Sequence, residues 1–137
     1  MNRLAFDTSA AVPLLVRSHV AHDSVRRHAA GRTAVLTVHS LAETYSVLTR
    51  LPGDARVSGP DAVRLLEANF GAPVAAPAGE LAALPAVLAP LGIVGGAVHD
   101  ALVGLAARAA GIPLVTRDAR ALGTYAALGA EIEIVSG

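Results

Sequence analysis

The sequence predicts an α/β fold with a central parallel sheet of about five short strands and helices on both faces. Three observations support this fold class. Short β-rich segments alternate with longer segments of helical periodicity, a pattern typical of parallel sheets. Hydrophobic residues make up 53% of the 137 residues, which is enough for a large core. No repeat, low-complexity tract or linker divides the chain, so we expect a single domain over residues 1–137.

The strands are predicted where short runs of apolar and β-branched residues are bounded by polar or turn residues. The first run ends at Asp7, and the fourth is followed closely by Asp118. The last run alternates between polar and apolar residues, as a half-buried strand does. The predicted strands cover residues 3–6, 33–37, 73–76, 112–116 and 131–135.

Helices are predicted between these strands from apolar stripes and from the residues that begin or end helices. Glycines 31, 111 and 129 follow three of these segments, the position at which glycine commonly ends a helix. Pro60 lies near the first turn of another segment, where its missing N–H has little effect. The predicted helices cover residues 9–16, 19–30, 38–51, 58–70, 80–90, 97–110 and 118–128.

Composition excludes several kinds of chemistry. The chain has no cysteine, which excludes disulfides and thiolate sites. All 11 basic residues other than histidine are arginine, so lysine Schiff bases and P-loop phosphate binding are excluded. Aromatic residues are only 3%, which argues against a base-stacking platform. Eleven acids balance the arginines, and this neutrality argues against a sequence-blind nucleic-acid coat protein.

We expect neither a signal peptide nor a membrane span. An acid follows within five residues of Asn2 and Arg3, so the start lacks the long apolar region of a signal peptide. The most apolar stretch, residues 81–98, is interrupted by prolines and glycines and is too broken to cross a bilayer. We therefore expect a cytoplasmic protein.

Four acids stand out by their positions. Asp7 and Asp118 both follow predicted parallel strands, so they lie at the sheet edge where α/β folds bind ligands. Glu43 and Asp100 lie inside predicted helices. Small residues beside Asp100, such as Gly104, permit the close approach of another backbone. These positions predict that the four acids converge.

Each acid also has a simpler interpretation. Asp7 and Asp118 would each contribute about 1 kcal/mol as caps of the helices that follow. Glu43 would form a weak i,i+4 pair with His39, and Asp100 would be an exposed helix position. As a cluster, however, the carboxylates would repel one another unless cations neutralised them. Such hard oxygen ligands suit Mg²⁺ or Mn²⁺, which activate water and stabilise phosphoryl charge.

Four segments carry a family resemblance that covers essentially the whole chain. They are residues 6–9 (FDTS), 40–43 (SLAE), 95–101 (GGAVHDA) and 114–118 (LVTRD). In this order they resemble the PIN-domain ribonucleases, and most closely the VapC-type toxins of VapBC toxin–antitoxin pairs. The resemblance implies a PIN-like three-layer α/β/α fold. It also implies a divalent-metal-dependent endoribonuclease that hydrolyses RNA phosphodiester bonds with Mg²⁺ or Mn²⁺.

Site residues are carried over from the resemblance position by position. Asp7, Glu43, Asp100 and Asp118 would be the metal-binding catalytic acids, and Thr116 and Ser9 would support them. One departure concerns packing. Many family members have an aromatic residue three positions after the last acid, where this chain has Ala121, so we expect altered packing around Asp118. His99 is interpreted as a flanking or helix-packing residue, because adjacent helical residues point about 100° apart.

The resemblance also implies partners: an RNA substrate, a small VapB-type antitoxin and a second copy in a homodimer. The helices between Val63 and Leu91 would be either the dimer surface or part of the core. Arg117 and Arg120 would contact RNA or a partner, or would be solvated surface residues.

The alternative function is a PIN-fold protein that binds RNA or a partner without cutting. Three other acidic or nucleotide-binding folds fit less well. A haloacid-dehalogenase-type phosphatase needs a second acid where Ser9 stands, and a receiver domain needs a lysine. A Rossmann nucleotide binder needs a glycine-rich turn after its first strand, and residues 7–10 do not form one.

Overall fold

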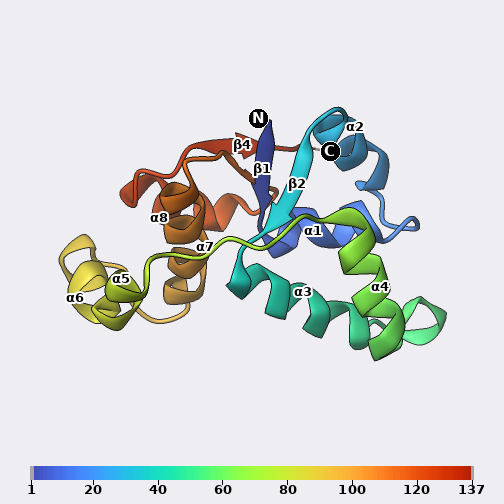
Figure 1. Cartoon of the computed structure of the whole chain (residues 1–137), viewed down its shortest axis with the longest axis horizontal. Helices are drawn as coiled ribbons and strands as arrows, with labels where there is room; N and C mark the ends of the chain where they lie inside the picture. The colour runs from blue at the N-terminus through green and yellow to red at the C-terminus, as the bar shows by residue number, and fades with distance from the viewer. Residues whose placement is uncertain (1, 137) are drawn as a thin grey trace.

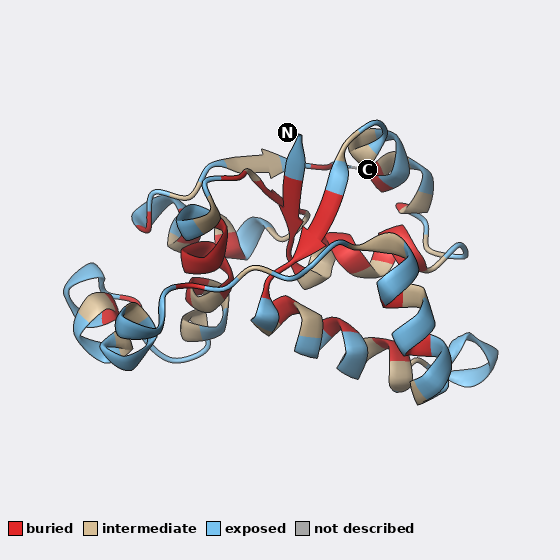
Figure 2. Ribbon diagram, viewed as in Figure 1, coloured by how far each residue is buried: buried red, intermediate tan, exposed pale blue. Residues whose placement is uncertain are grey.

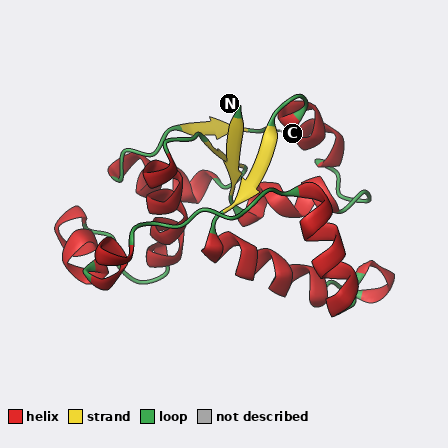
Figure 3. Ribbon diagram, in the orientation of Figure 1, coloured by secondary structure: helices red, strands yellow, loops and turns green. Residues whose placement is uncertain are grey.

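The computed structural model describes residues 2–136, which form a four-stranded, fully parallel sheet in the order β2-β1-β3-β4 (Figure 1). The strands are β1 (Arg3–Phe6), β2 (Thr33–Leu36), β3 (Leu114–Thr116) and β4 (Ile132–Ile134). Helices surround the sheet in Figure 3, and the predicted α/β class is confirmed.

The central strand β1 pairs with β2 over its whole length, from Arg3 opposite Thr33 to Phe6 opposite Leu36. On its other side β1 pairs with β3, where Phe6 lies opposite Val115. Because all strands are parallel, their carboxyl ends meet at one edge of the sheet.

The predicted strand over residues 73–76 is reduced to a single bridge between Val74 and Thr37. Val74 donates its N–H to the Leu36 carbonyl and accepts one from Val38, both at 2.9 Å. Pro73 and Pro77 flank this contact and have no N–H to extend it into a ladder. The segment therefore runs along the edge of β2 as an extended strap, so the described sheet has four strands.

Eight α-helices are described, and their order follows the predicted alternation. They are α1 (Thr8–Leu15), α2 (His22–Ala29), α3 (Val38–Thr49), α4 (Gly59–Asn69), α5 (Ala78–Ala82), α6 (Leu84–Leu88), α7 (Ala97–Ala110) and α8 (Leu122–Ala127). Three 3₁₀ turns lie at Gly53–Ala55, Ala89–Leu91 and Ala119–Ala121. The prediction of residues 97–110 matches α7.

Two predicted helices are broken. Residues 80–90 form α5, α6 and a 3₁₀ turn, because the Pro85 ring would clash with the Leu81 carbonyl in a continuous helix. Residues 118–128 begin as a 3₁₀ turn that Asp118 caps, and α8 starts only at Leu122.

The core has a layer on each face of the sheet. Leu4, Phe6 and Leu36 face one side and pack with residues of α1 to α4. Ala5 and Leu114 face the other side and pack with residues of α7 and α8. Figure 2 shows the buried residues concentrated in the strands and on the inner sides of these helices. The three-layer α/β/α prediction is confirmed.

The helices between residues 63 and 91 do not form one surface. Figure 1 shows α4 at one end of the molecule and α5 with α6 at the other, joined by the strap beside β2. Within residues 2–136, no helix is both long and apolar enough to cross a membrane.

Candidate active site

The four predicted acids line one cavity of about 100 Å³. Asp7 follows β1, Asp118 follows β3, Glu43 projects from α3 and Asp100 from α7. The cavity is completed by Thr8, Ser9, Val103 and Tyr125. The parallel sheet brings Asp7 and Asp118 together at its carboxyl edge, and the two helices bring the other acids over that edge.

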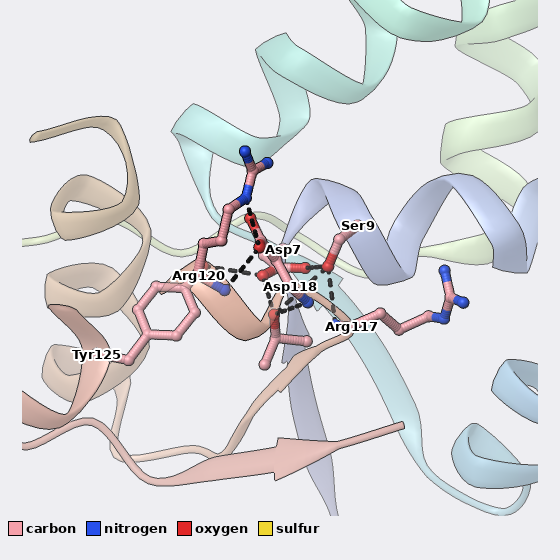
Figure 4. A network of polar contacts seen from close by, with 7 residues as sticks. Asp7, Ser9, Arg117, Asp118, Arg120 and Tyr125 are labelled. Atoms are coloured by element: carbon pink, nitrogen blue, oxygen red, sulfur yellow. Dashed lines mark hydrogen bonds and ion pairs between the residues drawn. The ribbon is translucent and has the colours of Figure 1, made fainter. Parts of the chain in front are cut away.

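Asp7 is 5% exposed, and its carboxylate accepts four hydrogen bonds. Its Oδ1 accepts from Ser9 Oγ at 2.6 Å and from the Ala10 N–H at 3.2 Å. Its Oδ2 accepts from Thr116 Oγ1 and from the Tyr125 hydroxyl at 2.9 Å (Figure 4). The Ala10 contact is the N-cap of α1, so Asp7 both caps a helix and faces the cavity.

The hydroxyls of Ser9 and Thr116 are oriented by the backbone. Ser9 Oγ accepts the Arg117 N–H at 2.8 Å, and Thr116 Oγ1 accepts the Asp118 N–H at 3.1 Å. Each hydroxyl therefore accepts one hydrogen bond and directs its own proton to Asp7. Both hydroxyls thus contact the Asp7 carboxylate, as expected for residues predicted to support the acids.

Glu43 is about half exposed at the rim of the cavity, and its Oε1 lies 3.0 Å from His39 Nε2. The predicted i,i+4 pair is thus present, as a close ion-pair contact rather than a well-angled hydrogen bond. The His39 ring stacks on His99, with centroids 5.3 Å apart and planes at 19°. His99 therefore packs between α3 and α7, as predicted.

The two arginines near the site differ. Arg120 Nε lies 3.5 Å from Asp118 Oδ1, and the Arg120 side chain is 93% exposed. Figure 4 shows Arg120 beside the carboxylates, whereas the Arg117 side chain extends away from them. Burial lowers the pKa of His19, and the charge of Arg117 lowers it further. Arg117 therefore lies on the side of the connection between α1 and α2, where His19 is found. Arg120 is the arginine closer to the acids.

The negative charge of the cavity acts on the pKa of Asp100. Burial raises the pKa of Asp100 above its ordinary value, and the charges of Asp118, Asp7 and Glu43 raise it further. His99 acts in the opposite direction. All four acids thus interact electrostatically, and their charges are only partly compensated by the chain.

Comparisons with known proteins agree with this geometry. Residues 4–127 match the family model described as the PIN domain. Ribonuclease VapC27 of Mycobacterium tuberculosis is 52% identical over 133 residues, which cover 97% of each chain. The chain belongs to the VapC ribonucleases of the PIN-domain family.

Solved structures share the fold of this PIN-domain ribonuclease. VapBC2 from Rickettsia felis, bound to a DNA fragment from its promoter, superposes with a TM-score of 0.69 at 14% identity, covering 98% of this chain and 99% of that one. VapC20 of M. tuberculosis, described as a Sarcin-Ricin loop cleaving toxin, gives 0.62 at 20% identity, covering 85% and 90%.

Tyr125 is a cavity residue that sequence reasoning missed. It is 1% exposed, and burial together with the Asp7 charge raises the pKa of its hydroxyl, which stays protonated as a donor. Ala121, where we expected altered packing around Asp118, is fully buried. It belongs to the same buried cluster as Tyr125, which follows it by four residues. The missing aromatic residue at position 121 was the one sequence signal that the packing near Asp118 differs. No local pattern indicated that Tyr125 would lie there.

Small residues on α7 were predicted to admit another backbone, and the structure shows a side chain instead. A Cβ on Gly104 would lie 3.2 Å from Tyr125 Cδ1 and 3.1 Å from Leu128 Cδ1. Gly104 therefore admits the tyrosine ring of α8 beside the acids. The close approach was predicted correctly, but the approaching group was not.

The residues fit a hydrated divalent cation. The donors are hard carboxylate oxygens, and Thr8 Oγ1, on the cavity wall, is buried without a hydrogen bond to any described residue. Among residues 2–136, no three histidine or acidic side chains are arranged to hold an ion by protein ligands alone. Mg²⁺ usually keeps several waters and takes only one or two carboxylates, which suits this looser arrangement.

Proposed function

We propose that this PIN-domain ribonuclease is a divalent-metal-dependent endoribonuclease and the toxin of a type II toxin–antitoxin pair. The observation that carries the proposal is the convergence of Asp7, Glu43, Asp100 and Asp118 on one cavity. The relationship to ribonuclease VapC27 supports RNA as the substrate.

Asp7, Asp100, Asp118 and Glu43 are the residues that would hold Mg²⁺ or Mn²⁺, one or two of them directly and the others through waters on the ion. When bound, the ion would supply an activated water and would stabilise charge on the phosphoryl group. Ser9 and Thr116 help to orient the Asp7 carboxylate through their backbone-anchored hydroxyls.

Arg120 would contact an RNA phosphate beside the acids. Its guanidinium is almost fully exposed, and its only charged contact among the described residues is the one with Asp118. Arg117 is directed away from the cavity, so we assign it no contact with the scissile phosphate.

The test is cleavage of structured RNAs by the purified protein with Mg²⁺ or Mn²⁺. The RNAs include a sarcin–ricin loop, since one structural neighbour is described as cleaving it. We expect Asp7→Asn to lower the rate of cleavage by more than about 100-fold. Loss of a residue that only hydrogen-bonds a metal ligand usually lowers activity by about 10–100-fold. Asp54→Asn, at an exposed acid remote from the cavity, is the matched control and should cleave normally.

Cleavage that persists in chelator, or in the Asp7→Asn protein, would contradict the metal mechanism. If the wild-type protein binds RNA but cuts none of a cellular RNA pool, the non-cleaving alternative would replace this proposal.

Two protein partners belong to the proposal. A small VapB-type antitoxin would insert a basic side chain into the acid cavity, where burial and the charges of the other three acids raise the pKa of Asp100. Co-expression with the small neighbouring gene should yield a complex that no longer cleaves RNA. A second copy would pack at the α6 end, where an apolar groove of about 320 Å³ includes Leu88 and Val94.

A further inference from the structure

Four donors hold the Asp7 carboxylate, and three of them are tied to the backbone. The Ala10 N–H is itself a backbone group. The Ser9 and Thr116 hydroxyls are fixed because each accepts a hydrogen bond from a backbone N–H. These three donors belong to the segments that directly follow or end β1 and β3, so the sheet edge alone places them.

The fourth donor, Tyr125, comes from a separate helix 118 residues along the chain from Asp7. Tyr125 lines the cavity, as Asp7 does, while Thr116 does not. Among the described residues, the Tyr125 hydroxyl makes one hydrogen bond, which it donates to Asp7 Oδ2. The packing of the Tyr125 ring determines where this hydroxyl lies. Gly104 and Val103 of α7 supply that packing.

An Asp7 carboxylate with three donors still has freedom at Oδ2, where Thr116 would be the only remaining partner. A carboxylate offers about four lone-pair directions, and the tyrosine occupies one at the cavity side. Groups that hydrogen-bond a ligating carboxylate fix its direction and tune its affinity for the ion.

We propose that Tyr125 is a positioning residue that holds Asp7 Oδ2 in the orientation required for cation binding. This inference rests on the proposed function, because it assumes that Asp7 is a metal ligand. It assigns to α8 a part in the site that the four acidic positions do not include.

The test is Mn²⁺ binding to the full chain, measured by calorimetry. Tyr125→Phe keeps the ring and removes only the hydroxyl, so we expect affinity to fall about 10–100-fold. Tyr45→Phe is the matched control, because Tyr45 is the other tyrosine, is 42% exposed and lies outside the cavity. Its affinity should equal that of the wild type. Thermal unfolding in chelator verifies that each variant is folded.

Tyrosine fluorescence gives a second readout that does not depend on cleavage. The chain has two tyrosines and no tryptophan, so emission from the Tyr45→Phe protein arises from Tyr125 alone. We expect Mg²⁺ to change this emission, since the ion alters the charge of the carboxylate that Tyr125 contacts. The same change should be absent when the Tyr125→Phe protein is titrated.

Wild-type affinity for Mn²⁺ in a folded Tyr125→Phe protein would overturn the inference and leave the proposed function standing. Emission that stays constant at saturating Mg²⁺ in the Tyr45→Phe protein would also overturn it. A wild-type protein that binds neither ion would overturn the proposed metal site, and this inference with it.

Discussion

At the scale of single residues, Asp7 joins two roles that the sequence presented as alternatives. It caps α1 through the Ala10 N–H, and it faces the cavity with the other acids. The hydrogen bond that caps the helix also helps to orient the carboxylate that lines the cavity. Glu43 combines roles in the same way, since it pairs with His39 at the cavity rim.

Asp100 allows a prediction about pH at this scale. Its pKa is raised by burial and by three neighbouring acids, so ionising it destabilises the folded protein. The penalty is absent below the unfolded pKa of about 3.9, and it is complete once pH has risen past the folded-state pKa. In chelator at about pH 8, Asp100→Asn should therefore raise Tm by about 2–4 °C over wild type.

The difference in Tm between the Asp100→Asn and wild-type proteins should shrink as pH falls towards about 4. Thermal unfolding across this pH range measures it, with Asp54→Asn as the exposed control. A difference that is absent at the higher pH, or that grows on acidification, would show that Asp100 does not carry this repulsion.

At the scale of elements, the site depends on how closely α7 and α8 approach. Asp100 and Gly104 lie one turn apart on α7, so the acid and the gap for the tyrosine ring share one face. Tyr125 crosses this gap to reach Asp7 at the end of β1. Gly104 thus leaves the room that the Tyr125 ring needs for its hydroxyl to reach Asp7.

Gly104→Ala should lower stability despite the higher helix propensity of alanine. The propensity gain is at most about 1 kcal/mol, whereas overpacking a rigid buried ring costs about 1–3 kcal/mol. We expect a lower Tm and altered Tyr125 emission. Gly123→Ala in α8, where the added Cβ meets nothing within 4 Å, should instead leave Tm unchanged or raise it. Equal stabilisation by both variants would exclude the close packing.

At the scale of the whole molecule, the edge of the sheet that carries the acid cavity lies between two helical ends. The α4 end and the α5–α6 end lie on opposite sides of the sheet region in Figure 1. Both expose apolar side chains, with Val63 at 47% and Val94 at 70%. The apolar groove beside Val94 favours the α6 end as the surface of the proposed homodimer.

Sedimentation can decide between the two ends. Val94→Lys should convert a dimer to a monomer, because it places a charge in the apolar groove. Val63→Lys, an equally drastic change at the other end, should sediment as the wild type does. If Val63→Lys is the variant that dissociates, the dimer surface lies on α4.

Much of the fold follows from local patterns in the sequence. The run before Asp7 and the helix over residues 97–110 were predicted correctly, because strand and helix periodicities are properties of short segments. The convergence of Asp7 and Asp118 also followed from sequence, since the carboxyl ends of parallel strands share an edge.

Only the tertiary structure decided what surrounds those acids. Val74 contributes a single bridge where a strand was predicted, because its proline neighbours limit pairing with β2. Tyr125 reaches Asp7 across 118 residues through the gap at Gly104. Such contacts depend on which distant segments pack together and how closely, and no periodicity within one segment carries that information. The sequence by itself determined the acids and their sheet edge. Packing between α7 and α8 determined the fourth contact of Asp7, the hydrogen bond from Tyr125.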